Sequence, residues 1–193
     1  VFNFNGDEMD VKTKYKELLN KTSERKEEVL KFAEFLEAKT NWLTAPASTR
    51  YHLNKEGGLL EHSVNVTEQL LKIKTCLSPE ILDESCIITG LFHDIGKVGL
   101  PGKPYYIPND NKWEIGKGIL YKINPEVTAM GIAARSIFIA AQHLRLKEDE
   151  AQAIAYHDGL FVPEGESIKH KEKPLTLLLH WADYWTVRTI EKK

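Results

Sequence analysis

The segment IITGLFHDIGKVG, residues 87–99, decides which fold we expect of this chain. It begins as an apolar run typical of a buried helix and ends in the pair His93-Asp94, which Gly96 and Lys97 follow closely. An ionised carboxylate at the end of a buried segment is costly unless it is paired or binds a metal. A divalent cation held by both side chains would remove that cost and act as a Lewis acid. The segment therefore predicts a buried metal site, provided that further ligands exist elsewhere.

Outward from this segment, most of the chain shows the apolar spacing of amphipathic helices. The stretch 101–125 differs, because it is rich in Gly, Pro, Asn and aromatic residues, which favours an irregular loop or a β-hairpin. The pattern predicts an all-α, compact multi-helix bundle with this one small insertion. The expected helices cover about residues 9–20, 23–38, 59–75, 78–96, 126–144, 147–156 and 174–192. The stretch 78–96 is expected to be either one helix or a pair broken near Asp83-Glu84.

The composition fits a single domain spanning residues 1–193, with 42% hydrophobic residues to build a core. Lys and Arg number 26 against 28 Asp and Glu, and this net charge of −2 gives no reason to expect duplex nucleic acid as a partner. A small nucleotide or a short single strand fits that charge. Cys76 and Cys86 lack CxxC spacing, and neither a leader nor a long apolar run is evident. We therefore expect a cytoplasmic protein with reduced thiols and no membrane span, of unspecified oligomeric state.

Two further segments supply candidate ligands. His62 lies in GGLLEHSVNV on one face of an apolar helix, and Asp183 lies in LLLHWADYW, inside a strongly apolar helix. Two buried acids and two buried imidazoles can all be satisfied if they converge on one cation. Mixed nitrogen and oxygen ligands suit Mn, Fe, Ni, Zn or Mg, so the ligand set does not identify the metal. The alternatives are an ordinary core histidine at His62 and an ion pair between Asp183 and His180, one turn earlier.

The order His62…His93-Asp94…Asp183 resembles the H…HD…D signature of the HD-domain metal-dependent phosphohydrolases. The strings GGLLEHS, LFHDIGK and LLLHWADYW carry the resemblance. It covers roughly residues 50–190 and leaves residues 1–45 as an N-terminal helical extension. The resemblance implies a helical HD-domain fold, one divalent metal ion bound by these four side chains, and hydrolysis of nucleotide-type phosphate esters.

The resemblance also implies roles for Lys97 and His157. Lys97 matches the lysine of HDxGK and is expected to meet a phosphate oxygen, although a solvated lysine at a helix end is the alternative. His157, in AIAYHDG, matches one of two extra histidines that two-metal members use. Ile132 stands where the second would be, and His143 lies at least one turn further along the helix. We therefore expect a single metal, a second one being less favoured, with His157 acting in catalysis as an acid or base together with Asp94.

Other residues are candidates for a substrate cleft. His52 precedes the first ligand by ten residues, and Arg135 follows the small-residue run MGIAA, from which its guanidinium could bind a second phosphate. The insertion could close over the site, with a tyrosine or Trp113 stacking on a base. The alternatives are an ordinary loop histidine, a helix-surface arginine and a hairpin whose aromatic residues pack only on one another.

The sequence thus predicts a metal-dependent phosphohydrolase that cleaves a nucleotide-type phosphomonoester or phosphodiester with metal-activated water. Whether it acts as a nucleotide phosphatase or on short strands stays open. Two other hypotheses belong to different classes. The first is a catalytically silent nucleotide-sensing module of the same fold, and the second is a scaffold in which buried His–Asp ion pairs replace the metal.

Overall fold

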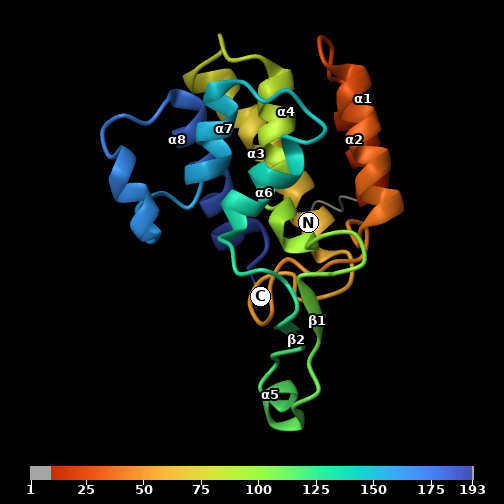
Figure 1. Ribbon diagram of the computed structural model, residues 1–193. Helices are drawn as coiled ribbons and strands as arrows, with labels where there is room; N and C mark the ends of the chain where they lie inside the picture. Colours follow the sequence, from red (N-terminus) through yellow and green to blue (C-terminus); the bar gives the residue numbers. More distant parts are fainter. Residues whose placement is uncertain (1–9, 193) are drawn as a thin grey trace, which may run out of the picture.

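The structure is a computed structural model that describes residues 10–192 and is mostly helical (Figure 1). The predominance of helix confirms the expected all-α fold class. The expected helix start at Met9 lies outside the described residues. The α-helices of the body are α1 (Val11–Asn20), α2 (Lys26–Lys39), α3 (Gly58–Leu77), α4 (Asp83–Phe92), α6 (Ile132–Ala140), α7 (Glu148–Tyr156) and α8 (Pro174–Trp185). Shorter helical turns are η1 (Ile95–Val98), η2 (Gly159–Phe161), η3 (Pro163–Ile168) and the π-helical η4 (Thr186–Ile190).

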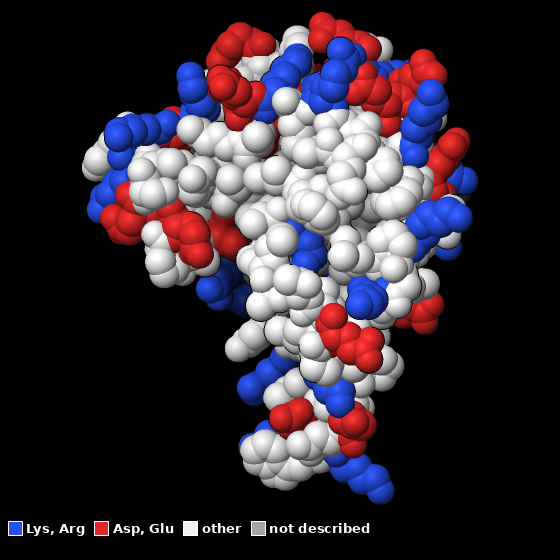
Figure 2. All heavy atoms as spheres, in the orientation of Figure 1, with Lys and Arg blue, Asp and Glu red and all other residues white. Residues whose placement is uncertain are grey.

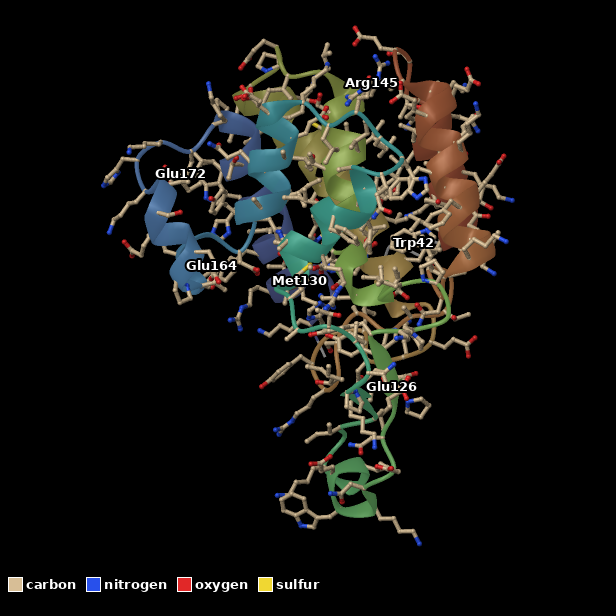
Figure 3. All side chains as sticks on the ribbon, in the orientation of Figure 1. Trp42, Glu126, Met130, Arg145, Glu164 and Glu172 are labelled. Atoms are coloured by element: carbon tan, nitrogen blue, oxygen red, sulfur yellow. The ribbon has the colours of Figure 1, made fainter. Side chains whose placement is uncertain are left out.

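Helix α3 lies in the middle of the fold and contributes to two hydrophobic cores. The first core joins α3 to α1, α2, α4 and α6, and it contains the fully buried Phe32, Phe92 and Trp42, the last labelled in Figure 3. The second core joins α3 to α4, α7 and α8 through side chains such as Leu70 and Leu179. Truncating a large buried aromatic to alanine typically costs about 3–5 kcal/mol. Packing on both sides therefore fixes the orientation of α3.

The helix expected from residue 78 begins later, at Asp83. The N–H of Ile81 donates to the carbonyl of Ser78, 3.1 Å away, which closes a β-turn with Pro79 as its second residue. Proline is favoured at that position of a turn, since its φ angle is already fixed near the required value. The Ser-Pro pair therefore forms a turn directly after α3, and α4 starts after Leu82.

Helix α6 also starts later than expected, at Ile132 in place of residue 126. Local hydrogen bonds between side chains and the backbone hold the preceding residues out of the helix. The Asn124 side chain accepts a hydrogen bond from the N–H of Glu126, and Arg135 donates to the carbonyl of Thr128 at 2.6 Å. These bonds satisfy groups that a longer helix would have used within itself.

The insertion contains the hairpin that the composition favoured. Strands β1 (Tyr106–Pro108) and β2 (Tyr121–Ile123) pair antiparallel, and the short helix α5 (Lys112–Gly116) lies between them. The Asn111 side chain accepts hydrogen bonds from two N–H groups of α5 and so caps it. The hairpin projects from the helical body (Figure 1), and Lys117 covers the ring of Trp113 on α5. The insertion therefore extends away from the body.

The charged side chains on the face drawn in Figure 2 are of both signs and are interspersed, with a broad uncharged area over α6. No extended basic area is present on that face, which agrees with the nearly balanced charge of the sequence. Among the described helices, none combines the length and the apolar character needed to cross a membrane.

Candidate metal centre

Five predicted side chains reach one buried place from four helices. His62 lies on α3 and Asp183 on α8. His93 directly follows the last residue of α4, Asp94 comes next and precedes η1, and His157 directly follows α7. The structure therefore brings together the four ligands that the sequence predicted and adds His157 to them.

Two glycines allow this convergence. A Cβ atom on Gly90 would lie 2.6 Å from Oγ1 of Thr67, so only glycine lets α4 pack this closely on α3. A Cβ atom on Gly96 would lie 2.3 Å from the carbonyl oxygen of Ile132 at the start of α6. The N–H of Gly96 also donates to Oγ of Ser136, at 2.8 Å. The glycine in HDIGK thus serves the packing of α6 against η1, beside the cluster.

The nitrogen and oxygen atoms of the cluster are separated by distances suited to common ligation. Nε2 of His62 lies 3.3 Å from Oδ1 of Asp183 and 3.7 Å from Oδ2 of Asp94. Nε2 of His93 lies 3.6 Å from Oδ2 of Asp94, and Nε2 of His157 lies 3.8 Å from Oδ1 of the same residue. Ligand atoms about 2.0–2.2 Å from one cation are roughly 3–4 Å apart. Two groups that share His93 could hold a metal ion, namely His62 with His93 and Asp94, and His93 with His157 and Asp183. A third group beside them joins His62 to His52 and Glu191.

The hydrogen bonds made by the other ring nitrogens set the tautomers. Nδ1 of His93 contacts the carbonyl of Gly90 and Nδ1 of His157 contacts that of Ile154, both at 2.9 Å. Nδ1 of His62 lies 3.0 Å from Oε2 of Glu191. Carbonyl and carboxylate oxygens only accept, so each Nδ1 carries the proton. In the neutral ring, each Nε2 then presents a lone pair toward the cluster, the state that metal ligation requires.

Two buried atoms of the cluster lack hydrogen bonds. Within residues 10–192, neither Nε2 of His93 nor Oδ1 of Asp183 has a hydrogen-bond partner, although Nε2 of His62 lies close to the latter. A buried polar atom without a partner costs about 1–3 kcal/mol. Both atoms are metal-ligand types and both face the same cluster, so a cation bound here would satisfy them together.

The charges of the cluster also fit a divalent cation. Burial disfavours ionisation of Asp94, but Lys97 and the neighbouring histidines outweigh it and hold the pKa of Asp94 well below its usual range. Burial also disfavours ionisation of Asp183, but the contact with His62 outweighs burial and lowers the pKa of Asp183. Counting Glu191 as the third carboxylate and Lys97 as the one ammonium, the group has a formal charge of −2 with neutral imidazoles. That charge equals the deficit that one divalent ion would neutralise.

The same excess of negative charge acts on the histidines in different ways. Burial opposes protonation of His62, yet contacts with Asp183 and Glu191 raise its pKa to about 10. His93 has no such hydrogen-bonded carboxylate, so burial lowers its pKa to about 4 and the ring is neutral at pH 7. His62 therefore carries a proton that a metal ion would have to displace from Nε2.

Three other predicted residues have different positions. Lys97 donates a hydrogen bond to Oδ2 of Asp94. It also lines the cavity beside the cluster, named the cluster cavity, whose volume is about 310 Å³. His52 also lines this cavity, its ring 4.9 Å from that of His62. Arg135 is buried, does not line the cavity, and has its guanidinium over the ring of Tyr105. The structure thus places Lys97 and His52 beside the cluster but not Arg135.

The positions that bear on a second metal are also clear. Ile132 lines the cluster cavity, as expected of a position where a ligand is missing. The ring of the exposed His143 instead packs on Phe35 of α2, with the ring centres 4.0 Å apart, away from the cluster cavity. Trp113, on the projecting hairpin, is not among the residues that line the cavity.

Sequence reasoning missed two residues, Glu191 and Asp158, and considered a third, His180, with a different partner. Glu191 is buried and binds both Nδ1 of His62 and the side chain of Asn65, and its late position in a charged tail gave no signal. Asp158 lies on the cavity wall, and the repetition of the dipeptide His-Asp at 157–158 could have identified it. His180, considered as a partner for Asp183, instead donates through Nδ1 to the carbonyl of His157, at 2.6 Å.

No protein-family model, curated protein or solved structure matches this chain. Its function therefore has to be inferred from the chemistry of the cluster and its cavity.

Proposed function

We propose that the chain is a metal-dependent phosphohydrolase of the HD-domain type that cleaves a nucleotide-type phosphomonoester or phosphodiester. One observation carries the proposal. Three buried imidazoles hold a proton on Nδ1 and direct Nε2 at two ionised carboxylates, and the group has a formal charge of −2 once the second proton of His62 is displaced. A structural ion-pair network needs neither three aligned Nε2 atoms nor unpartnered ligand atoms.

The residues that would hold the ion are His62, His93, Asp94 and Asp183. Their imidazole content favours Fe, Ni or Zn over Mg, because imidazole is a poor ligand for hard cations, while Mn is intermediate. When bound, a divalent ion would polarise a phosphoryl oxygen and lower the pKa of a bound water molecule.

The other residues of the cavity would bind the phosphate and move protons. The ammonium of Lys97 is fixed beside Asp94 and can direct its remaining N–H groups to a phosphoryl oxygen. Nε2 of His157 can take a proton from the attacking water and return one to the leaving oxygen as the P–O bond breaks. The half-exposed carboxylate of Asp158 lies 3.8 Å from that nitrogen and can stabilise its protonated form.

The test combines metal binding with hydrolysis. We expect protein stripped with EDTA to bind one equivalent of Mn, Fe, Ni or Zn by calorimetry and to hydrolyse bis-p-nitrophenyl phosphate or p-nitrophenyl phosphate only after metal is restored. His93→Gln and Asp183→Asn should each abolish both properties. His170→Asn, which changes an exposed histidine outside the cavity, serves as the matched control and should retain both.

The outcomes separate the three classes of function. Metal binding without hydrolysis of any phosphoester would support the nucleotide-sensing module instead. Neither metal binding nor hydrolysis, in protein that folds normally by circular dichroism, would support a scaffold with buried ion pairs and overturn the proposal.

A further inference from the structure

We propose that the cluster cavity is the middle part of a longer trench whose two ends bind the parts of a short single-stranded oligonucleotide on either side of the cleaved phosphate. This inference rests on the proposed function and specifies its substrate. Two neighbouring cavities carry it, and each shares lining residues with the cluster cavity.

The first neighbour, named the apolar cavity, has a volume of about 260 Å³. Its walls include Tyr156, Leu160 and Ile168, and it shares Phe161 and His180 with the cluster cavity. The second neighbour, named the basic cavity, is lined by three cations, Arg50, Arg188 and Lys192. Its one carboxylate, Glu191, is already bound to the side chains of His62 and Asn65. It shares His52, Val187 and Arg188 with the cluster cavity. The cluster therefore lies between an apolar and a cationic depression.

The chain from α8 through η4 forms one wall along the whole trench. Thr176 and Leu177 line the apolar cavity, Asp183 lines the cluster cavity, and Lys192 lines the basic cavity. At 1.5 Å per α-helical residue, the 12 residues of α8 alone are roughly 18 Å long, and η4 continues the wall beyond them. That length exceeds what one mononucleotide occupies, so a substrate that fills the trench must extend on both sides of the cluster.

The apolar end suits a nucleobase. Phe161 is 70% exposed, and its ring stacks on that of Tyr184 with centres 5.4 Å apart. Exposed aromatic rings are stacking surfaces for bases of any identity. The cavity also contains one carboxylate, Glu172, which can accept hydrogen bonds from the amino edge of a base. Figure 3 labels Glu172 on the lobe formed by η2 and η3, beside α8.

The basic end suits a further phosphate group. Arg50, Arg188 and Lys192 are exposed, and across residues 10–192 none of them forms an ion pair with a carboxylate. Arg188 instead lies over the ring of Tyr184, 5.4 Å from its centre. Guanidinium groups bind phosphate in a bidentate manner. The order along the trench is thus base, cleaved phosphate and next phosphate, which is the order of groups along a nucleic acid strand.

The experiment compares three probes on the metal-loaded protein: a 5′-phosphorylated thymidine trinucleotide, thymidine 5′-monophosphate and bis-p-nitrophenyl phosphate. We expect kcat/KM for the trinucleotide to exceed both other values by at least tenfold. The kcat/KM for the trinucleotide should also fall as the salt concentration rises, because binding of its phosphate groups releases counterions and is therefore weaker at high salt.

Two variants locate the ends of the trench. Phe161→Ala should lower kcat/KM for the trinucleotide by roughly five- to a hundredfold, as expected for loss of one stacking residue. Arg50→Gln should lower the ratio of trinucleotide to bis-p-nitrophenyl phosphate hydrolysis about tenfold and reduce the salt slope by about 0.7, as for one lost phosphate contact. Lys112→Gln, the same charge change on the projecting hairpin, is the matched control and should alter neither quantity.

The outcomes are distinguishable from failure of the proposed function. If bis-p-nitrophenyl phosphate is hydrolysed but the trinucleotide is no better a substrate, or if Arg50→Gln and Lys112→Gln behave alike, the trench does not bind a strand. If no probe is hydrolysed at all, the proposed function itself fails. Phe161 and Arg50 are both exposed, so neither substitution should prevent folding.

Discussion

Replacing Arg25 by methionine should destabilise the fold strongly, because this guanidinium joins two buried carboxylates. Arg25 is 6% exposed, and its Nη1 and Nη2 atoms bind the carboxylate of Glu150 at 2.7 and 2.6 Å. Its Nε atom binds Glu84 at 3.2 Å. Methionine fills much of the same volume but leaves both carboxylates without a counter-charge. Removing one partner of a buried ion pair costs about 3–5 kcal/mol, so we expect a loss of that size.

The measurement is urea unfolding followed by circular dichroism at pH 7, in EDTA so that metal binding does not contribute. For a protein of this size, a change of about 1 kcal/mol in unfolding free energy shifts Tm by roughly 2–4 °C. The Tm of the variant should therefore be roughly 6–20 °C below that of wild type. The matched control is Arg145→Met. Arg145, labelled in Figure 3, pairs with Glu28 at the surface and its side chain is 83% exposed. Such pairs contribute about 0–1 kcal/mol.

The pH dependence of the lost unfolding free energy distinguishes the cost of an unpaired buried charge from the cost of lost packing. In wild type the guanidinium helps to lower the pKa of Glu84, whereas in the variant burial without that guanidinium favours the protonated carboxyl. The difference in unfolding free energy between wild type and Arg25→Met should therefore shrink as the pH falls toward 5. A loss below about 1 kcal/mol, equal to that of Arg145→Met, would refute the reasoning. A large loss that does not change with pH would show that packing, and not charge, is responsible.

Four other predictions follow from the geometry. Glu191→Gln should lower metal affinity about 10- to 100-fold by calorimetry with little change in folding, because it weakens the bond that orients His62; unchanged affinity would exclude this role. An Ellman assay should count one reactive thiol in the native protein and two in urea, since Cys76 is exposed, whereas burial raises the pKa of Cys86 to about 12. Burial opposes ionisation of Glu84, but hydrogen bonds from backbone N–H groups and the neighbouring guanidinium lower its pKa. The stability from Glu84 is therefore present above its unfolded pKa of about 4.3 and lost below it, and Glu84→Gln should flatten that acid limb in urea titrations. Gly96→Ala should cost about 1–3 kcal/mol in unfolding free energy by overpacking the start of α6, and a neutral result would contradict the close approach found there.

The sequence was sufficient to predict which side chains of apolar segments meet at the cluster. His62, Asp94 and Asp183 each stand among residues that must be buried, and a buried charge requires a partner. That requirement can be read without knowing the fold. Convergence on a shared cation was therefore one expected solution, and an ion pair between Asp183 and His180 in the same apolar segment was the other.

Residues that act through long-range contacts were not predictable in this way. Glu191 lies 129 positions from His62 in a charged segment, where an exposed carboxylate would be the ordinary expectation. Arg135 illustrates the opposite error. Its place on a helix suggested a free guanidinium. The structure instead has an irregular segment before α6, and the carbonyl of Thr128 in this segment accepts a hydrogen bond from Arg135. Periodicity identifies the face of a helix but not the position where tertiary contacts end it.

The ion network of Arg25 and the ligand cluster are held by the same two helices, at opposite ends. Glu84 and Glu150 lie in the first turns of α4 and α7, while His93 and His157 directly follow their last residues. Each helix is roughly 15 Å long, so the network and the cluster are separated by little more than one helix length. Arg25 fixes the spacing of the N-terminal ends, and at the C-terminal ends Nε2 of His157 lies 3.8 Å from Oδ1 of Asp94. A shift of either helix would have to break contacts at both ends. The scaffold therefore holds the Nε2 atoms in place before any ion binds, which reduces the ordering cost of metal binding.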